Sequence, residues 1–595
     1  MRPSTQRGHV RSRGRFPLVI AASAFAACNG EHPDSSDGEE RTTALPRAAN
    51  ARVASEEVAW RLRDVAPERG LSRRIVCGSP QKLSIVESLG CGCAFFDANS
   101  DGRLDVFVAN AMAVEDGRPV PGPGVALYLQ VAGGSFRDAT VESGLEFRGW
   151  SVGVATGDFD ADGDTDLFLG CHGPDRLYEN RNGVFVDVAE RAGIDSPGLS
   201  TSALFFDHDG DGRLDLWVTR YVRIDPGAPP NGGEPCIENG TRVACGPTFY
   251  SPAPDALWRN LGDGRFEDIT DRVGIANAPG GYGLGVASGD FDGDGTTDIY
   301  VANDTTANFL WMRRGDRYVD EALFAGAALS EEGQGQAGMG AAVGDADGDG
   351  HLDIFVTNYS QEKNALYRGI GTGLFEDRSS RSGFGAESFL ALGWSAAFAD
   401  LDNDGDEDLF VANGHVHPQV SDVQASFSYL QPCFVYRNDG AGRFVESGAH
   451  LGADVVEPRA HRGAALADFD DDGDLDVLIS VIDGPPVLLL NELPPGAHSL
   501  LVELRGTRAN REGIGALVRL RVDGRTLVRH VGRGGGYLSS SDARAHFGLG
   551  RAASAEAIEV GWPGGRTEHH GSLDAGFVWR ITEGDPVPQR VRALR

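Results

Sequence analysis

The sequence predicts an all-β protein, namely a seven-bladed β-propeller followed by a small β-sandwich-like domain. Three observations carry this prediction. An acidic loop recurs seven times, a hairpin motif follows most copies of it, and one unpaired strand motif stands before the first copy. Units of four short strands at a period of roughly fifty residues are typical of propeller blades.

The acidic loop is clearest at residues 290–298, where Asp stands at positions 1, 3, 5 and 9 and Gly at position 6. This pattern is similar to the first half of an EF-hand calcium loop, in which side-chain oxygens and the position 7 carbonyl surround the cation. No Glu stands at position 12, so we expect the ninth-position Asp to close the site. The flanking residues are β-branched and aromatic, which places the loop between two strands.

A single loop of this kind is equally compatible with an ordinary Asp-Gly turn, but seven copies favour metal binding. We therefore predict about seven Ca²⁺ ions, with position 7 contributing its backbone carbonyl. Only the first loop departs from the pattern, with Asn99 at position 3. The predicted ligand residues are Asp97, Asn99, Asp101, Arg103 and Asp105; Asp158, Asp160, Asp162, Asp164 and Asp166; Asp207, Asp209, Asp211, Arg213 and Asp215; Asp290, Asp292, Asp294, Thr296 and Asp298; Asp345, Asp347, Asp349, His351 and Asp353; Asp400, Asp402, Asp404, Asp406 and Asp408; and Asp468, Asp470, Asp472, Asp474 and Asp476.

The hairpin motif has a Gly-rich turn, as in residues 257–268, which run from Leu-Trp-Arg-Asn to Phe-Glu-Asp. The last unit ends at residues 488–491 and lacks the Phe-x-Asp strand, whereas residues 62–65 stand unpaired before the first unit. We expect this N-terminal strand to complete the last blade, because closing the ring removes open sheet edges.

The N-terminal residues 1–28 are predicted to be a lipoprotein signal peptide. Arginines precede the apolar stretch 16–27, which is too short to span a bilayer and ends in Ala-Ala-Cys28. This ending resembles the lipobox of bacterial lipoproteins, with Cys28 as the lipid-carrying residue, although Phe25 departs from the usual aliphatic residue. Plain cleavage after Ala24 or Ala26 is an alternative.

The remaining boundaries follow from composition and motif positions. Residues 29–58 are polar and are expected to form a disordered tether. The propeller is placed at 59–496, the C-terminal domain at 497–584 and a tail at 585–595. The chain is thus expected to be exported, as a cell-surface or outer-membrane lipoprotein or as a periplasmic or extracellular protein, and to meet a membrane only through its lipid.

The net charge limits the possible partners, and the cysteines are interpreted from the expected compartment. The net charge of −33 argues against nucleic acid, which requires a basic surface. In an exported protein the cysteines after Cys28 are expected to form disulfides rather than redox sites. Cys236 and Cys245 bracket a short segment and are the best candidate pair. The pairing of the others is left open: Cys77, Cys91, Cys93, Cys171 and Cys433.

Several segments resemble a known family. Residues 301–306, 336–340 and 413–415 are similar to segments of cartilage-acidic-protein-type propellers with FG-GAP/VCBS repeats, which are integrin-like. Residues 506–510, 514–516, 536–539, 546–550 and 562–565 resemble the ASPIC/UnbV domain. The resemblance covers most of the predicted mature chain and implies an exported calcium-binding propeller with a β-rich companion domain. It implies no settled reaction.

The matches to catalytic sequence motifs lack the secondary structure that those motifs require. Residues 149–153 fit G-x-S-x-G, but they lead into a predicted blade strand rather than into a helix. The glycines at 333, 335 and 338 fit G-x-G-x-x-G without a surrounding βαβ pattern, and no H-E-x-x-H occurs. The sequence therefore names no catalytic residue.

The face opposite the acidic loops is the predicted ligand face. The long insertions 220–255 and 413–432 fall there, and polar groups at a propeller mouth are a default binding site. The alternative is that these polar residues only cap strand ends. The ligand-face candidates are Asn303, Asp304, Asn358, Asn413, His415 and His417.

Two functions follow from this arrangement. The favoured one is an extracellular or surface scaffold for adhesion or binding. In this function calcium stabilises the fold, and the ligand is a protein or a glycan. The alternative is an enzyme that acts on glycans or other polymers through the insertion face. An enzyme requires two carboxylates or a His–Asp pair at working distance on that face.

Overall fold

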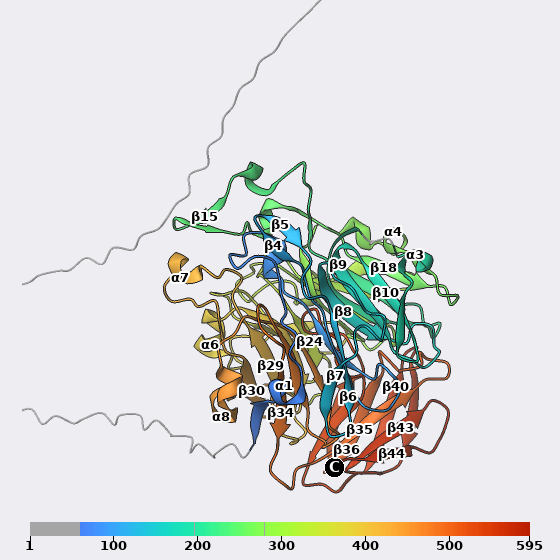
Figure 1. The fold of residues 1–595 in the computed structure, drawn as a ribbon. Coiled ribbons are helices and arrows are strands. Elements are labelled where there is room, and N and C mark those ends of the chain that lie inside the picture. The colour runs from blue at the N-terminus through green and yellow to red at the C-terminus, as the bar shows by residue number, and fades with distance from the viewer. Residues whose placement is uncertain (1–59, 195–196, 279) are drawn as a thin grey trace, which may run out of the picture. The chain divides into compact units, whose positions relative to one another are not determined.

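The computed structural model describes residues 60–194, 197–278 and 280–595, which lie within one compact unit, Glu56–Arg595. The predicted signal peptide with Cys28 and the whole predicted tether lie outside the described residues. No helix among the described residues is long and apolar enough to cross a membrane. The predicted all-β fold is confirmed, because four-stranded antiparallel sheets make up the propeller (Figure 1).

Seven blades follow one another along the chain; six of them join four strands in sequence order, and the last takes its fourth strand from the N-terminus. The first three are β2 (Cys93–Phe96), β3 (Asp105–Val108), β6 (Ala126–Val131) and β7 (Ser135–Asp138); β8 (Ser151–Gly157), β9 (Asp166–Pro174), β10 (Arg176–Arg181) and β11 (Val184–Asp187); and β12 (Pro197–Phe206), β13 (Asp215–Arg220), β18 (Ala256–Asn260) and β19 (Phe266–Asp268). The second and third blades are joined by pairing of β9 with β12.

The other blades repeat this order. They are β20 (Gly283–Gly289), β21 (Asp298–Asn303), β22 (Phe309–Arg314) and β23 (Arg317–Asp320); β24 (Ala341–Gly344), β25 (Asp353–Val356), β26 (Ala365–Gly369) and β27 (Phe375–Asp377); β28 (Gly393–Ala399), β29 (Asp408–Asn413), β30 (Phe434–Asn438) and β31 (Phe444–Glu446); and β32 (His461–Ala467), β33 (Asp476–Val481), β34 (Val487–Glu492) and β1 (Arg61–Asp64).

The last blade is completed by the N-terminal strand, as the motif count predicts. Strand β1 pairs antiparallel with β34, with Leu62 opposite Asn491. Leu62 is buried and packs into the hydrophobic core between the last two blades. The predicted ring closure is therefore confirmed, and the G-x-S-x-G segment lies at the start of strand β8, without the helix that a nucleophile elbow requires.

Short elements decorate the blades. The insertions carry β4 (Ala113–Glu115), β5 (Arg118–Val120), β14 (Val222–Arg223), β15 (Cys236–Glu238), β16 (Thr241–Val243), β17 (Ser251–Pro252), η1 (Pro230–Gly233) and η2 (Pro247–Phe249). The helices are α1 (Ala66–Arg69), α2 (Ile85–Ser88), α3 (Ala189–Ala192), α4 (Thr270–Val273), η3 (Ile275–Asn277), α5 (Ala322–Ala325), α6 (Gly385–Leu390), α7 (Val420–Val423), α8 (Gly448–Leu451) and α9 (Ala453–Val456). The predicted Cys236–Cys245 disulfide is confirmed, and the other described cysteines are buried thiols.

The C-terminal part forms two four-stranded sheets with a shared apolar core, as a small sandwich does. One sheet contains β38 (Ala545–Gly550), β35 (His498–Arg505), β43 (Phe577–Thr582) and β44 (Gln589–Ala593), and the other contains β37 (Arg525–His530), β36 (Leu517–Val522), β40 (Ala557–Trp562) and β41 (Arg566–His570). A short pair, β39 (Ser554–Ala555) and β42 (Leu573–Asp574), lies beside them.

One segment of the C-terminal part enters the centre of the propeller. We call residues 534–542, between β37 and β38, the channel segment. Its backbone bonds to the inner strands of several blades: Gly536 with Ala341, and Ser540 with Cys93 and Phe95. Tyr537 is fully buried, donates from its hydroxyl to the Leu89 carbonyl (3.1 Å) and packs on Trp394. The C-terminal part is therefore built into the propeller rather than linked to it by a free tether.

Candidate metal centres

The seven acidic loops share one hydrogen-bonded frame. In every loop the position 1 carboxylate accepts the backbone N–H of the position 6 glycine, at 2.7–3.0 Å. These glycines have φ between +84° and +106°, which a side chain at that position would resist. The position 1 carboxylates are thus held in place by the turn itself.

The ninth-position Asp carries a second role that the sequence did not reveal. One of its oxygens accepts the N–H of loop position 2, and the other accepts an N–H from the third strand of the same blade. In the second loop these donors are Phe159 and Asn180, at 2.9 and 2.7 Å from Asp166. The same pair of bonds recurs in all seven loops. This Asp therefore fastens the loop to its blade, whatever it contributes to an ion.

Buried carboxylate oxygens without a hydrogen-bond partner mark the interior of five loops. They are Oδ1 of Asp158, Asp209, Asp347, Asp400 and Asp470. An unpaired buried oxygen of this kind is costly unless a cation or water reaches it. Since the donor set is oxygen only, it fits a hard divalent cation such as Ca²⁺ and disfavours zinc or copper.

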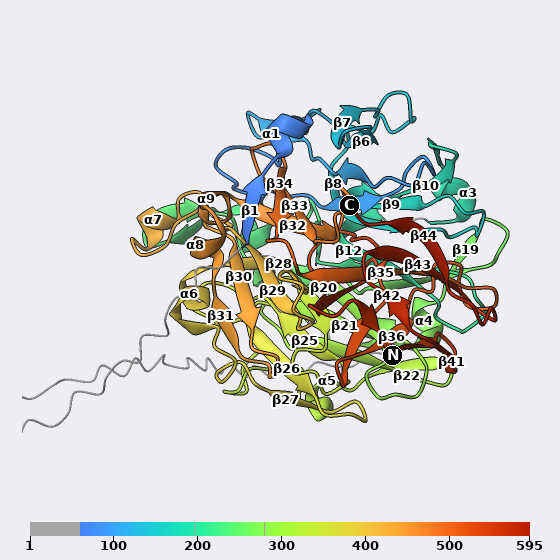
Figure 2. The ribbon, with the colours of Figure 1, turned by 90° about the horizontal axis from the view of Figure 1, so that it is seen from below.

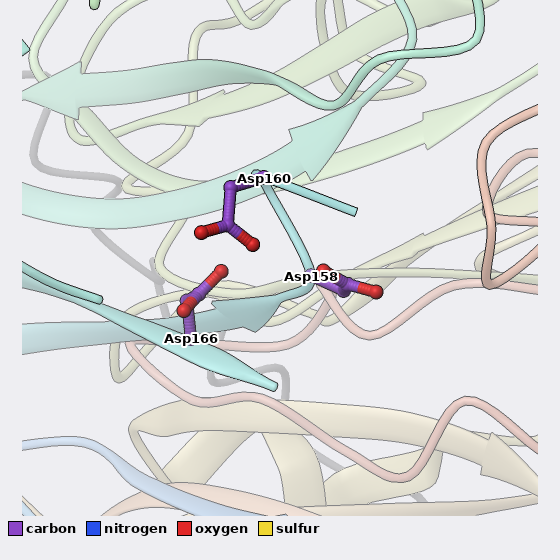
Figure 3. Close-up of side chains that lie close together, drawn as sticks. All are labelled: Asp158, Asp160 and Asp166. Atoms are coloured by element: carbon purple, nitrogen blue, oxygen red, sulfur yellow. The ribbon is translucent and has the colours of Figure 1, made fainter. Parts of the chain in front are cut away.

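The loop carboxylates are also close enough to share an ion. At least five groups of three acidic side chains have one potential ligand atom from each member within 4.8 Å of the others. In the second loop the group is Asp158, Asp160 and Asp166, and Figure 3 shows the last two turned toward each other. Four further groups lie in later loops: Asp207, Asp209 and Asp215; Asp290, Asp292 and Asp294; Asp345, Asp347 and Asp353; and Asp400, Asp402 and Asp404.

Crowding and burial disfavour the charged carboxylates while no cation neutralises them. Burial, followed by the charge of neighbouring carboxylates, raises the pKa of Asp158 to about 7 and that of Asp468 to about 8. Burial raises the pKa of Asp298 to about 8, although backbone N–H donors act in the opposite direction. A divalent cation would reverse these shifts, because it stabilises the ionised form.

Two residues of the hairpin motif support the loops, and sequence reasoning missed their role. In Trp258-Arg259-Asn260, the arginine pairs with Asp209 at loop position 3 (2.6 Å). Asn260 donates from Nδ2 to the carbonyl of Phe159 in the preceding loop (2.7 Å) and to Leu214 in its own loop (3.0 Å). The signal was the recurrence of Arg-Asn in the motif itself.

Equivalent amides link other neighbouring loops. Asn180 donates to Ala98, Asn438 to Ala346, and Asn491 to Leu401. Gln130 closes the ring by donating to Phe469 of the last loop. Five of the seven boundaries between loops therefore carry a side-chain amide bond of this kind, so a change in one loop reaches the next.

The C-terminal part contacts the loops directly. The Gly548 N–H donates to Asp400 Oδ2 (2.9 Å), and Glu512 accepts the backbone N–H of Asp158 (2.9 Å). Arg544 donates to the Asp468 carbonyl (3.0 Å). The C-terminal sheets are shown from below in Figure 2. The loop face of the propeller is thus partly covered by this chain's own second domain.

The predicted ligand-face residues are buried at strand ends. Asn303, Asn358 and Asn413 donate from Nδ2 to the carbonyls of Ala307, Lys363 and Pro432, at 2.7–2.9 Å. Each NH2 group therefore caps a strand end, as in the alternative interpretation given above, while the amide oxygen of each side chain is buried without a partner among the described residues.

The other three candidates are also enclosed. Asp304 accepts a hydrogen bond from the Tyr221 hydroxyl, and His415 Nδ1 accepts the His417 N–H (3.1 Å). Burial lowers the pKa of His415 to about 3 and that of His417 to about 4, so both rings are neutral near pH 7. Ligand contact by these six residues stays a prediction.

Comparison with known proteins agrees with the repeat pattern. Residues 97–169, 158–218, 243–301, 290–356 and 345–411 match the FG-GAP-like repeat model. Residues 506–588 match the ASPIC and UnbV model. Cartilage acidic protein 1 of Homo sapiens is 29% identical over 53% of this chain and 45% of its own length. The Mus musculus protein is 28% identical over 53% of this chain and 46% of its own length. The match thus spans about half the length of these relatives.

Solved structures with a detectable likeness include a lectin of Agrocybe aegerita described as recognising non-reducing terminal N-acetylglucosamine. It is 16% identical, with a TM-score of 0.36 over 62% of this chain and 84% of its own. The Dos1 propeller is 8% identical, with a TM-score of 0.33 over 73% of this chain and 95% of its own. On the evidence of the repeats, the C-terminal domain and the relatives, the chain belongs to the cartilage-acidic-protein-like family of FG-GAP propellers that carry an ASPIC/UnbV domain.

Proposed function

We propose that this chain is an exported, calcium-dependent binding scaffold in which the ions hold the propeller together. The observation that supports this most is the set of buried carboxylate oxygens without partners inside the acidic loops. Their oxygens lie near one another in a turn whose backbone already fixes them. A scaffold role fits a site in which every ligand belongs to a loop between two strands of one blade.

In each loop we assign the ion to the carboxylates at positions 1, 3 and 5 and to the position 7 carbonyl. The ninth-position Asp adds an oxygen where it lies within the group, as Asp166, Asp215 and Asp353 do. The first loop offers one carboxylate fewer, and Arg103 pairs with its Asp101, so we expect the weakest affinity there. A bound ion would neutralise part of the negative charge and would thereby reduce the repulsion among the carboxylates of the loop.

The first test counts the ions. The full chain is treated with a chelator, desalted and dialysed against calcium, and bound metal is measured. We expect about seven ions per chain, and we expect magnesium to bind more weakly because it demands a tight octahedron. A chain that takes up no calcium would refute the proposal.

Export and anchoring form a separate part of the proposal. It is supported by the disulfide in the insertion, since disulfides persist in oxidising compartments. The apolar stretch ending at Cys28 adds the lipid anchor, which needs more than one acyl chain to be stable. We expect Cys28→Ser to release the protein from membranes, and membrane fractionation that is unchanged in this variant would contradict the anchor while leaving the calcium sites intact.

A further inference from the structure

A cleft of about 420 Å³ opens between the first two acidic loops and the C-terminal domain. Its walls come from parts of the chain far apart in sequence. The propeller contributes Asp97, Gly102 and Asp158, and the C-terminal sheet contributes residues of β35, β43 and β44. Such a volume holds on the order of ten water molecules or more, which leaves room for a small organic ion.

Arginine dominates the lining of this cleft. Six guanidinium groups line it, together with five carboxylates, so the lining alone carries one net positive charge in a chain whose total is −33. The six are Arg505, Arg511, Arg533, Arg544, Arg580 and Arg592. A planar guanidinium group matches carboxylate, sulfate or phosphate with two parallel hydrogen bonds.

Two of these arginines have donor capacity that the protein leaves unused. Arg533 donates from Nε and Nη2 to Glu512 Oε1, at 2.9 and 2.6 Å, while its buried Nη1 has no partner among the residues that the structure describes. The side chain of Arg533 is only 11% exposed, so this donor is held in place. Arg505 lines the same cleft, is exposed, and makes no ion pair within the described chain.

Calcium in the second loop would release a third arginine. Arg511 Nε lies 3.4 Å from Asp158 Oδ2, which is its carboxylate partner. An ion in this loop engages Asp158 and places two positive charges beside Arg511, so the attraction that holds this guanidinium is weakened. Ions in the first and second loops together add four positive charges at the edge of the cleft.

We propose that this cleft binds a ligand bearing oxyanion groups, carboxylate or sulfate, and that calcium in the second loop strengthens the binding. The calcium dependence rests on the function proposed above. Arg505 and Arg511 bind the oxyanion directly, while Arg533 Nη1 supplies a fixed donor at the inner end. The anion takes the place that Asp158 gives up, so the cleft accepts negative charge only when the loop is loaded.

The test uses the full chain, saturated with calcium or treated with chelator, and two probes, inorganic sulfate and a sulfated disaccharide. Binding is followed by calorimetry. We expect saturable binding in calcium that weakens at least ten-fold in chelator, and tighter binding of the disaccharide if the natural ligand is an acidic carbohydrate. Equal affinity for both probes would point to a free small anion as the ligand.

Arg505→Gln and Arg511→Gln should each weaken sulfate binding about ten-fold or more, as the loss of a charged hydrogen bond does. Arg521→Gln is the matched control, because Arg521 is 64% exposed and pairs with Glu556 (3.1 Å) outside the cleft. Melting temperatures of all three should stay near that of the parent, which separates lost binding from lost folding.

The failures of the two proposals are distinguishable. Calcium uptake without sulfate binding would refute the proposed oxyanion site and leave the calcium scaffold unaffected. The same holds if Arg521→Gln weakened sulfate binding as much as Arg505→Gln and Arg511→Gln. Sulfate binding that is the same with calcium and with chelator would overturn the calcium dependence. A chain that takes up no calcium removes the function proposed above and the calcium dependence with it.

Discussion

The two faces of the propeller both bury polar side chains, but the side chains differ in charge and in the groups they contact. On the loop face, carboxylate oxygens such as Asp347 Oδ1 lie buried without partners among the described residues, and burial raises the pKa of Asp345 in the same loop to about 7. On the insertion face, Asn413 donates to a backbone carbonyl and His415 is held neutral. The unpartnered atoms of the loop face are carboxylate oxygens grouped within single loops, which suits a cation, whereas on the insertion face each asparagine caps a strand end and leaves one amide oxygen without a partner among the described residues.

The channel segment connects these faces. It starts from β37 of the C-terminal part, passes the inner strands and reaches Leu89 and Trp394 through Tyr537. The C-terminal domain therefore contacts at least three of the loops, and under the function proposed above an ion in each loop stabilises the same face. The following predictions alter one face at a time.

Among single substitutions, the largest effect is expected where the two faces are joined. Tyr537→Ala should lower the free energy of unfolding by about 3–5 kcal/mol, because it removes a fully buried ring from a packed centre. Tyr537→Phe is the matched control and should lose only about 1 kcal/mol with its hydroxyl bond. Denaturant unfolding measures both, and an Ala variant as stable as the parent would show that the channel segment does not hold the ring.

The insertion face should show its buried histidines in acid. The folded protein keeps His417 neutral to a pKa of about 4, while the unfolded chain takes up a proton near pH 6.5. Proton uptake therefore favours unfolding, so this contribution to stability is full above pH 6.5 and is lost as the pH falls toward 4.

His417→Leu should accordingly reduce the loss of unfolding free energy between pH 7 and pH 5 by about 2 kcal/mol. His569→Leu, at a side chain that is 73% exposed, is the control and should leave the pH dependence of the parent. Identical pH profiles for the parent and the His417 variant would contradict the buried, neutral state of this ring.

A matched pair of asparagines compares the faces directly. Asn260→Ala and Asn413→Ala each remove a buried amide bond and should each cost about 1–3 kcal/mol. Only Asn260→Ala should also lower the affinity for calcium, since Asn260 joins two loops. Calcium titration of both variants tests this. If Asn413→Ala instead weakened ligand binding without loss of stability, the insertion face would be the ligand face.

The smallest effect is expected within the loop face, between the first and last loops. In calcium-containing buffer, Asp468→Asn should lower the free energy of unfolding by about 1 kcal/mol, because one well-bound ion is lost. Asp97→Asn should cost less, because its loop already lacks one carboxylate at Asn99. Metal analysis should show about one ion fewer in the Asp468 variant. Equal losses in both variants would contradict the ranking of the loops.

The repeating elements could be predicted from the sequence because local chemistry specifies them. Position 6 needs glycine for its backbone angle, and a missing Phe-x-Asp strand in the last unit leaves a gap that residues 62–65 fill. The Cys236–Cys245 pair was predictable because a short hairpin brings the two residues together. All three features depend on neighbours in sequence or on a count of repeats.

The features that the sequence did not reveal depend on long-range contacts. The sequence around Tyr537 does not indicate that this residue lies at the centre of the propeller, since its partners Leu89 and Trp394 are distant in sequence. Likewise nothing local shows that Asn303 and Asn413 each donate to a backbone carbonyl, which lies a few residues away for Asn303 and about twenty for Asn413. Polar residues at strand ends satisfy backbone groups as readily as they bind ligands, and only the contacts distinguish the two roles.

The central claim is that cations complete the loop face, and thermal unfolding with and without calcium tests it most directly. Extracellular calcium modules bind at roughly 0.1–1 mM, and at about 1 mM calcium with a dissociation constant near 0.1 mM one site adds about 1.4 kcal/mol. Seven such sites approach 10 kcal/mol, comparable to the stability of a whole domain. Chelation should therefore lower the melting temperature by many degrees, calcium should restore it, and magnesium should not. The same melting temperature in calcium and in chelator would contradict the account.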